Sequence, residues 1–143
     1  LDQDIYTKIR AIKGSEWTEK FASEVYENVK KHRYFITNLG KCTQLDARPL
    51  PDCVYKKYLN LLETEIELIQ PKVVILFGNQ VSSIVLGEKI SVSQCRCKLS
   101  QKCINGKEYD CYSVFYPVGN GRFHIDKAID DISYIIRTLK DKE

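Results

Sequence analysis

Apolar residues recur at helical spacing in three stretches of the chain. One such residue returns every four positions from Trp17 to Val29, which predicts a helix over residues 16–31. A second stripe predicts a helix over residues 52–69, which Pro71 ends. The most regular apolar face, over residues 125–139, predicts a third long helix. A shorter stretch of apolar residues at helical spacing after Gly78 predicts a short helix there.

Three stretches with strand character alternate with these helices: residues 34–38, 72–77 and 109–116. The pair Asn105-Gly106 predicts a tight hairpin turn before the last of them. This alternation predicts an α/β fold, a three-layer α/β/α sandwich around a short, mostly parallel sheet. Three strands are few for such a sheet. Because the chain begins with Leu1 rather than Met, we expect a first strand upstream and an N-terminally incomplete single domain over residues 1–143.

The composition is that of a globular protein and narrows the function only slightly. Of 143 residues, 43% are hydrophobic and 29% are charged. Lys and Arg number 22 against 19 Asp and Glu, a net charge of +3, which permits a phosphate-binding face without requiring one. No apolar run approaches the roughly 18–20 residues that span a bilayer, and no signal peptide pattern opens the chain. We therefore expect no membrane partner.

Unusual residues stand at the carboxyl ends of all three predicted strands, the edge of a parallel sheet where ligands bind. The amide of Asn38 closes an apolar strand. Gly78 and Asn79 allow a close backbone approach at a helix start, which suits phosphate. The third strand ends in a glycine-rich loop that runs from Tyr116 to Arg122. Together they predict a site for a phosphate- or nucleotide-bearing ligand.

Three segments give the chain a family resemblance. The sequence YFITNLGKC at residues 34–42 resembles the Y-I-T-N-x-x-K-C strand of the iron–sulfur uracil-DNA glycosylases, the thermostable, family 4-like branch. The sequence IELIQPKVVILFG at residues 66–78 resembles their I-x-L-I-x-P-K-V-I-V-x-L-G segment. Residues 116–118, Tyr-Pro-Val, stand where that superfamily has His-Pro-Ser. The resemblance spans residues 14 to 139 in the family's order.

The resemblance implies hydrolysis of the N-glycosidic bond of a uracil that is flipped out of DNA, as part of base-excision repair. The protein would be a cytoplasmic, prokaryotic monomer. Asn38 suits uracil because its amide can accept from N3–H and donate to O4, whereas cytosine presents the opposite pattern. Trp17 would stack on the base, although its register with Phe21 equally fits a core position. Tyr116 would act near base O2 in catalysis, without the cationic form that His provides.

The same resemblance assigns DNA contacts at the sheet edge, with plainer interpretations beside them. The expected contacts are Lys41, Gly78, Asn79, Asn120 and Arg122. An ordinary solvent-exposed turn would also explain the last two, and His124 is expected to start the final helix. The family's opening G-E-A-P-G motif, which positions the hydrolytic water, has no match here. A non-catalytic DNA-binding relative and an unrelated nucleotide-binding domain therefore remain alternatives.

The chain has six cysteines, which have two separate interpretations. In the resemblance, Cys42 matches a ligand of a 4Fe-4S cluster, and we assign Cys53 as a second ligand. The remaining cluster ligands would lie upstream, so the ligand set here is incomplete. The other four cysteines are expected to form disulfides across the hairpin, with a zinc site or free thiols as alternatives: Cys95, Cys97, Cys103 and Cys111.

Overall fold

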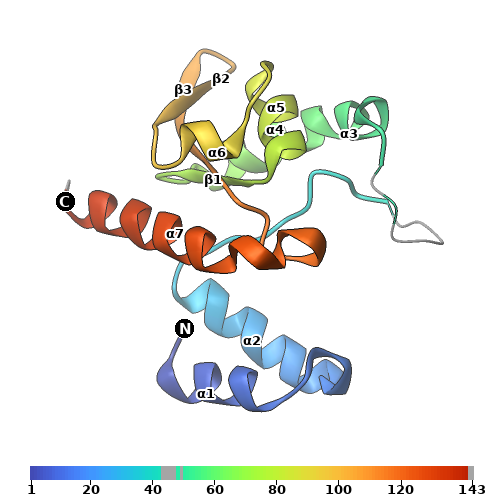
Figure 1. Ribbon diagram of the computed structural model, residues 1–143, viewed down its shortest axis with the longest axis vertical. Helices are drawn as coiled ribbons and strands as arrows, with labels where there is room; N and C mark the ends of the chain where they lie inside the picture. Colours follow the sequence, from blue (N-terminus) through green and yellow to red (C-terminus); the bar gives the residue numbers. More distant parts are fainter. Residues whose placement is uncertain (43–47, 49, 142–143) are drawn as a thin grey trace. The chain divides into compact units, whose positions relative to one another are not determined.

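A computed structural model gives the structure of the chain and describes residues 1–42, 48 and 50–141; of Asn120 it describes the backbone only. The chain divides into two compact units, Leu1–Asn38 and Leu39–Glu143, which are described separately below (Figure 1). The expectation of a single domain stays a prediction. None of the described helices combines the length and the apolar character needed to cross a bilayer.

The first unit is helical. It consists of α1 (Gln3–Ala11), a 3₁₀ turn η1 (Gly14–Glu16) and α2 (Glu19–Lys31). The predicted start of α2 at residue 16 is wrong because Thr18 caps the helix, its side-chain oxygen accepting from the backbone N–H of Phe21 at 3.2 Å. Apolar side chains of α1 and α2 form the core of this unit: Ile5, Phe21 and Val25, packed with Ile9, Ile12, Trp17 and Val29.

The strand predicted over residues 34–38 is not present. The segment has no regular secondary structure, and the side chains of Tyr34, Phe35 and Ile36 are 50%, 58% and 70% exposed. Aromatic and β-branched residues favour extended backbone, but a strand also needs a neighbour that takes its hydrogen bonds. Among the described residues no strand pairs with this segment.

The second unit contains the sheet. Its elements in chain order are α3 (Asp52–Lys57), α4 (Leu59–Ile69), β1 (Val74–Phe77), α5 (Asn79–Leu86), α6 (Val92–Cys95), β2 (Ser100–Ile104), β3 (Lys107–Val114), the 3₁₀ segment η2 (Gly119–His124) and α7 (Ile125–Lys140). The single helix predicted over residues 52–69 is divided at Tyr58, whose backbone (φ −94°, ψ −3°) departs from helical values. As predicted, α4 ends before Pro71, at the left-handed residue Gln70.

The three strands form one short sheet in the order β1-β3-β2. The strands β1 and β3 are parallel, with Phe77 opposite Val114, and β2 and β3 form the predicted antiparallel hairpin. At its turn Asn105 and Gly106 both have positive φ, 47° and 82°, as a type I′ turn requires.

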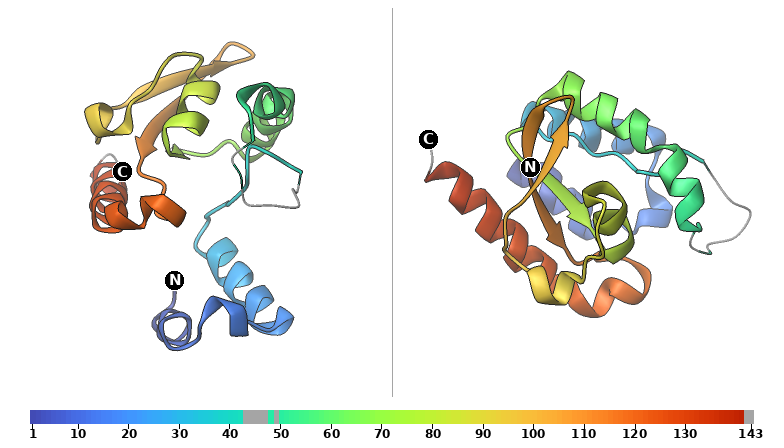
Figure 2. Two further views of the ribbon diagram at one scale, coloured as in Figure 1. Left: turned by 45° about the vertical axis from the view of Figure 1, so that its right-hand side comes forward. Right: turned by 90° about the horizontal axis from the view of Figure 1, so that it is seen from above.

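Helices cover both faces of this sheet (Figure 2). On one face Leu76 and Cys111 belong to a core that includes Leu62 of α4 and Val85 of α5. On the other face Tyr112 and Val114 pack with Ile135 of α7. Side chains of a strand alternate between faces, so each strand supplies both cores. This confirms the predicted α/β fold with a short sheet.

Candidate active site

The carboxyl ends of β1 and β3 bring Gly78 and Tyr116 together. The backbone N–H of Gly78 donates to the Val114 carbonyl at 2.8 Å. Its backbone (φ 87°, ψ 164°) is open to glycine and strained for other residues. A β-carbon at Gly78 would lie 3.3 Å from Cβ of Tyr116. The predicted proximity of the glycine corner and the tyrosine is therefore present.

Side-chain hydrogen bonds fix the start of α5 at this edge. The side-chain oxygen of Asn79 accepts from the Val92 N–H at 2.9 Å, which ties α5 to α6. The Gln80 amide donates to Asp52 at 2.7 Å and to the Leu50 carbonyl at 2.9 Å, which ties α5 to α3. Asn79 is exposed, and its NH₂ group is the part left to meet a phosphate. Its predicted DNA contact stays a prediction.

The segment after β3 folds back on itself at Gly121. A β-carbon at Gly121 would collide with the carbonyl oxygen of Tyr116, and the Gly121 N–H donates to the Val118 carbonyl at 3.0 Å. The side chain of Tyr116 is 56% exposed. Within the described part of the chain its hydroxyl has no hydrogen-bond partner, so it is available to a ligand.

An aromatic stack joins the two ends of this segment. The rings of Phe115 and His124 stack with centroids 4.5 Å apart. Arg96 and Lys127 approach the Phe115 ring, at 5.9 Å and 5.7 Å from its centroid. As predicted, His124 stands at the start of α7. Its stacking partner was not predicted, because nothing in the sequence indicates which aromatic ring it would meet.

Arg96, which approaches the Phe115 ring, also forms an ion pair with a buried carboxylate. Asp131 of α7 is 1% exposed, and its carboxylate accepts from Arg96 Nε at 3.0 and 3.1 Å. The Cys97 thiol lies 3.4 Å from the same carboxylate, and burial, with this hydrogen bond, raises the pKa of Cys97. The sequence did carry a signal for Asp131, a carboxylate in helical register with the apolar residues Ala128 and Ile135.

The remaining residues predicted to contact DNA differ in their surroundings. The Lys41 ammonium lies 2.9 Å from both carboxylate oxygens of Glu65. Arg122 is exposed, and its guanidinium carbon lies 5.0 Å from the centroid of the Phe123 ring. The side chain of Asn120 lies outside the described residues. All three contacts stay predictions.

The two residues predicted to hold the base belong to the first unit. Asn38 is exposed and is the last residue of this unit. Trp17 packs edge-on against Phe21 with centroids 5.0 Å apart, as the core interpretation requires, although its buried indole N–H has no partner in the described residues. Recognition by Asn38 and base stacking by Trp17 stay predictions.

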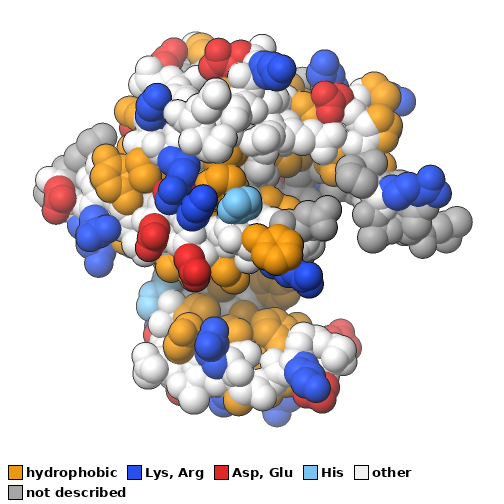
Figure 3. Space-filling model, viewed as in Figure 1, with side chains coloured by type: hydrophobic (Ala, Val, Ile, Leu, Met, Phe, Trp, Pro, Cys, Tyr) orange, Lys and Arg blue, Asp and Glu red, His pale blue; other side chains and the backbone are white. Residues whose placement is uncertain are grey.

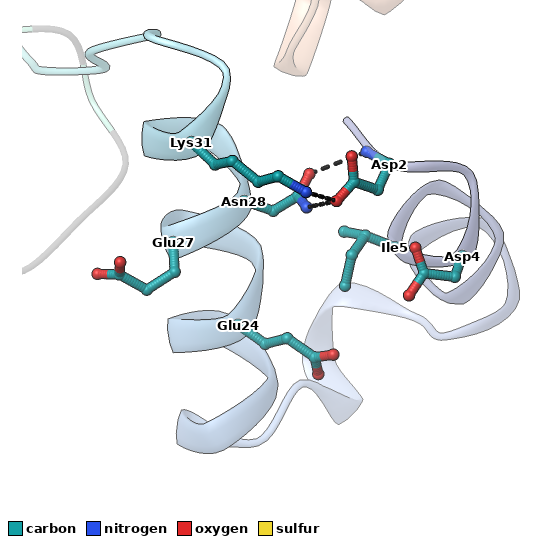
Figure 4. A pocket seen from close by; sticks show the side chains of 7 residues that line it. All are labelled: Asp2, Asp4, Ile5, Glu24, Glu27, Asn28 and Lys31. Atoms are coloured by element: carbon teal, nitrogen blue, oxygen red, sulfur yellow. Dashed lines mark hydrogen bonds and ion pairs between the residues drawn. The ribbon is translucent and has the colours of Figure 1, made fainter.

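The first unit also holds a pocket of about 330 Å³ between α1 and α2 (Figure 4). Asp2 at its rim already accepts hydrogen bonds from Lys31 and Asn28, both at 2.7 Å. We assign no ligand to this pocket.

Of the arrangements that the sequence left open for Cys95, Cys97, Cys103 and Cys111, the structure has the free thiols. All six are free thiols, so the favoured disulfides are absent. In the hairpin Cys103 stands opposite Glu108 and Cys111 opposite Ser100, which keeps these two apart. Cys42 and Cys53 are exposed. The described residues bring together no group of three or more potential metal ligands, and the resemblance places only two cluster ligands in this part of the protein. Cys42 and Cys53 as cluster ligands stay a prediction, and we derive no chemistry through a cluster.

These features define an α/β protein with an accessible edge where two parallel strands end beside a helix start. Residues 9–138 match the Uracil DNA glycosylase superfamily, and the chain belongs to that superfamily. Membership supports a glycosylase-like function directed at DNA. The particular likeness to the iron–sulfur branch stays a prediction.

Proposed function

We propose that the protein hydrolyses the N-glycosidic bond of uracil in DNA, as an enzyme of base-excision repair. The observation that carries this proposal is the meeting of Gly78 and Tyr116 at the carboxyl edge of β1 and β3, in a member of this superfamily. The base would be flipped out of the stack to reach this edge, because its glycosidic bond is inaccessible within a duplex.

Tyr116 would act on the departing base. Negative charge develops on the uracil as the bond to the sugar breaks, and a hydroxyl donor placed at O2 stabilises it. The exposed, unpartnered Tyr116 hydroxyl can supply that hydrogen bond. Because tyrosine is neutral, the stabilisation is smaller than a cationic group would give.

Asn38 would select the base, and residues at the sheet edge would hold the DNA strand. The Asn38 amide matches the donor and acceptor pattern of uracil and opposes that of cytosine. Gly78 and Asn79 would approach a phosphate at the N-terminus of α5. Lys41 would contact DNA by exchanging its bond with Glu65 for one with a phosphate.

The decisive experiment is an excision assay with the full chain. Single- and double-stranded oligonucleotides with one uracil are incubated with the protein, and abasic sites are revealed by alkaline cleavage. We expect cleavage at uracil and none at thymine or cytosine. Tyr116→Phe should lower the rate at least about tenfold, whereas Tyr134→Phe, a matched change on α7, should not. Asn38→Asp should reduce the preference for uracil. Uncleaved uracil in both forms of DNA would reject the enzymatic proposal.

A non-catalytic DNA-binding relative is the second candidate, favoured by a tyrosine where a charged donor would serve catalysis better. It predicts that the protein binds the same oligonucleotides and releases no base. Measuring fluorescence anisotropy and abasic sites on the same samples separates the two candidates.

A further inference from the structure

The apolar surface of α7 is wider than the part of it that the sheet covers. The buried residues of this helix are Ala128, Asp131 and Ile135, and Ile135 packs on the sheet against Tyr112 and Val114. A second line of apolar residues runs along the helix about a quarter turn away from the buried line. This line, called the isoleucine stripe below, consists of Ile125, Ile129, Ile132 and Ile136.

The isoleucine stripe is only partly covered. Ile125 and Ile129 are 45% and 55% exposed, and Ile132 and Ile136 are half-buried. None of the four belongs to the apolar cores that the described residues of the second unit form. Single exposed apolar side chains are ordinary on a protein surface, whereas a continuous line of them marks a contact surface.

The spacing of the stripe is typical of a helix that pairs with another helix. Its members are separated by four, three and four positions, which is the spacing of the a and d positions in a coiled coil. A helix with such a narrow line contacts its partner along the length of the line. A second copy of α7 supplies a partner helix with the same length and the same spacing.

The charges beside the stripe indicate how a second copy would lie. Asp126 and Lys140 are exposed and stand on the same flank of the stripe, fourteen positions apart with Ser133 midway. The acidic residue lies in the first turn of α7 and the basic residue in the last turn. In the described part of the chain neither of them forms an ion pair. Figure 3 shows hydrophobic, acidic and basic side chains at the surface over α7.

We propose that the isoleucine stripe is the contact between two copies of this chain, which pair antiparallel through α7 about a twofold axis. Ile125 of each copy would pack on Ile136 of the second copy. Ile129 of each copy would pack on Ile132 of the second copy. A twofold axis makes the two ends of this contact identical, so all eight isoleucines are covered by one arrangement.

Electrostatics favour the antiparallel direction over the parallel one. In a parallel pair Asp126 would face Asp126 of the second copy, and Lys140 would face Lys140. In the antiparallel register Asp126 of each copy lies toward Lys140 of the other. Helical side chains lean toward the N-terminus of their own helix, and in this register that direction brings the carboxylate and the ammonium toward each other at both ends.

This contact goes beyond the proposed function and does not rest on it. It replaces the monomer that the sequence led us to expect with a dimer. Because four isoleucines from each copy make a small interface, the dimer should form reversibly and depend on protein concentration.

Sedimentation equilibrium of the full chain over a wide range of concentration tests the apolar contact. The average mass should rise from 16.6 kDa toward twice that value. Ile129→Lys should weaken dimerisation at least about tenfold, because each copy loses a buried apolar side chain from the contact. Ile129→Ala, a milder change, should weaken it in the same direction. Leu68→Lys, the same change at an 80% exposed residue of α4, is the matched control and should dimerise like the wild type. Circular dichroism shows that each variant is folded.

Charge reversal at low salt tests the direction of the two helices. Asp126→Lys or Lys140→Asp alone places like charges at both ends of the antiparallel dimer and should weaken it about threefold to tenfold, as two exposed ion pairs would. The two reversals combined restore opposite charges and should return the affinity to that of the wild type. In a parallel dimer each single reversal would leave like charges facing each other as before, so neither a loss nor a rescue is expected.

Each result supports or overturns the contact. A chain that stays monomeric at every concentration would overturn it, and a lower melting temperature of monomeric Ile129→Lys would then show that another part of the same chain covers the stripe. A dimer that Ile129→Lys leaves intact would also overturn it. A dimer that is lost in Ile129→Lys but does not respond to the charge reversals would overturn the antiparallel arrangement.

Discussion

The rings of Phe115 and His124 stack at 4.5 Å with an angle of 28° between their planes. Phe115 directly follows β3 and His124 directly precedes α7, so the stack joins the two ends of the segment 116–123. That segment carries Tyr116, the proposed catalytic group, and the cation of Arg122. The stack therefore fixes the base of the segment on which the proposed function depends.

Removing the stack should loosen this segment. We expect His124→Ala to lower the free energy of unfolding by about 1 kcal/mol, the usual contribution of an aromatic pair. His124→Phe keeps a ring at the same place and should retain most of the free energy of unfolding. Urea denaturation measures the stability, and amide exchange over residues 116–123 should be faster in the alanine variant. Unchanged stability and exchange in that variant would contradict the role given to the stack.

Gly121 should not tolerate a side chain. A β-carbon there would collide with the Tyr116 carbonyl oxygen, which is backbone and cannot rotate away. We expect Gly121→Ala to cost about 1–3 kcal/mol, as overpacking does, and to displace Tyr116. Gly14→Ala is the matched control because a β-carbon at Gly14 would meet no atom within 4 Å. Equal melting temperatures for the two variants would show that the segment adapts freely.

Local patterns were sufficient to predict the sheet edge. Alternation and apolar runs placed two of the strands near residues 75 and 113, and parallel strands put their carboxyl ends on one edge. The adjacency of Gly78 and Tyr116 followed from that rule without any knowledge of side-chain packing. The hairpin followed equally directly, because few residue pairs other than Asn105-Gly106 adopt two positive φ angles so readily.

Interactions between distant residues could not be predicted. Arg96 and Asp131 are separated by 35 positions, and no periodicity connects a short irregular segment with the face of a helix. The failed strand at residues 34–38 has the same cause. Its composition favours extended backbone, but whether a strand forms depends on a pairing partner elsewhere in the structure.

The number of free thiols can be counted directly. Because all six are thiols, a thiol reagent added to the denatured, unreduced protein should detect six, and each disulfide would lower that count by two. In the native protein Cys103 is exposed, whereas burial raises the pKa of Cys111 to about 11. We expect Cys103 to be alkylated quickly and Cys111 to be protected, because the thiolate is the reactive form. Mass spectrometry of alkylated peptides measures both, and rapid labelling of Cys111 would contradict its burial.

The first unit should lose stability in acid through Asp2. Hydrogen bonds from Lys31, His32 and Asn28 hold the pKa of Asp2 well below its ordinary value of 3.8. Its stabilising effect is therefore complete above that value and is lost as the pH falls through the lower pKa of the folded protein. We expect Asp2→Asn to melt at a lower temperature than the wild type at pH 6, with a difference that shrinks below pH 4. Asp4→Asn, a change on the neighbouring turn, should show a smaller difference at pH 6. A difference for Asp2→Asn that is constant with pH would contradict this assignment.

The buried carboxylate of Asp131 should depend on its ion-pair partner for the stability of the second unit. It is 1% exposed and its nearest cation is Arg96, at 2.9 Å. Arg96→Met would leave the carboxylate buried without a cation, at a cost of about 3 kcal/mol, the lower end for a broken buried pair because Arg96 itself is about one-third exposed. Arg96→Met combined with Asp131→Leu removes both charges and should recover most of that loss, since a buried pair is often replaceable by apolar side chains. Urea denaturation of Arg96→Met, Asp131→Leu and the double variant gives the coupling free energy between the two residues. Additive losses would show that the pair does not act as a unit.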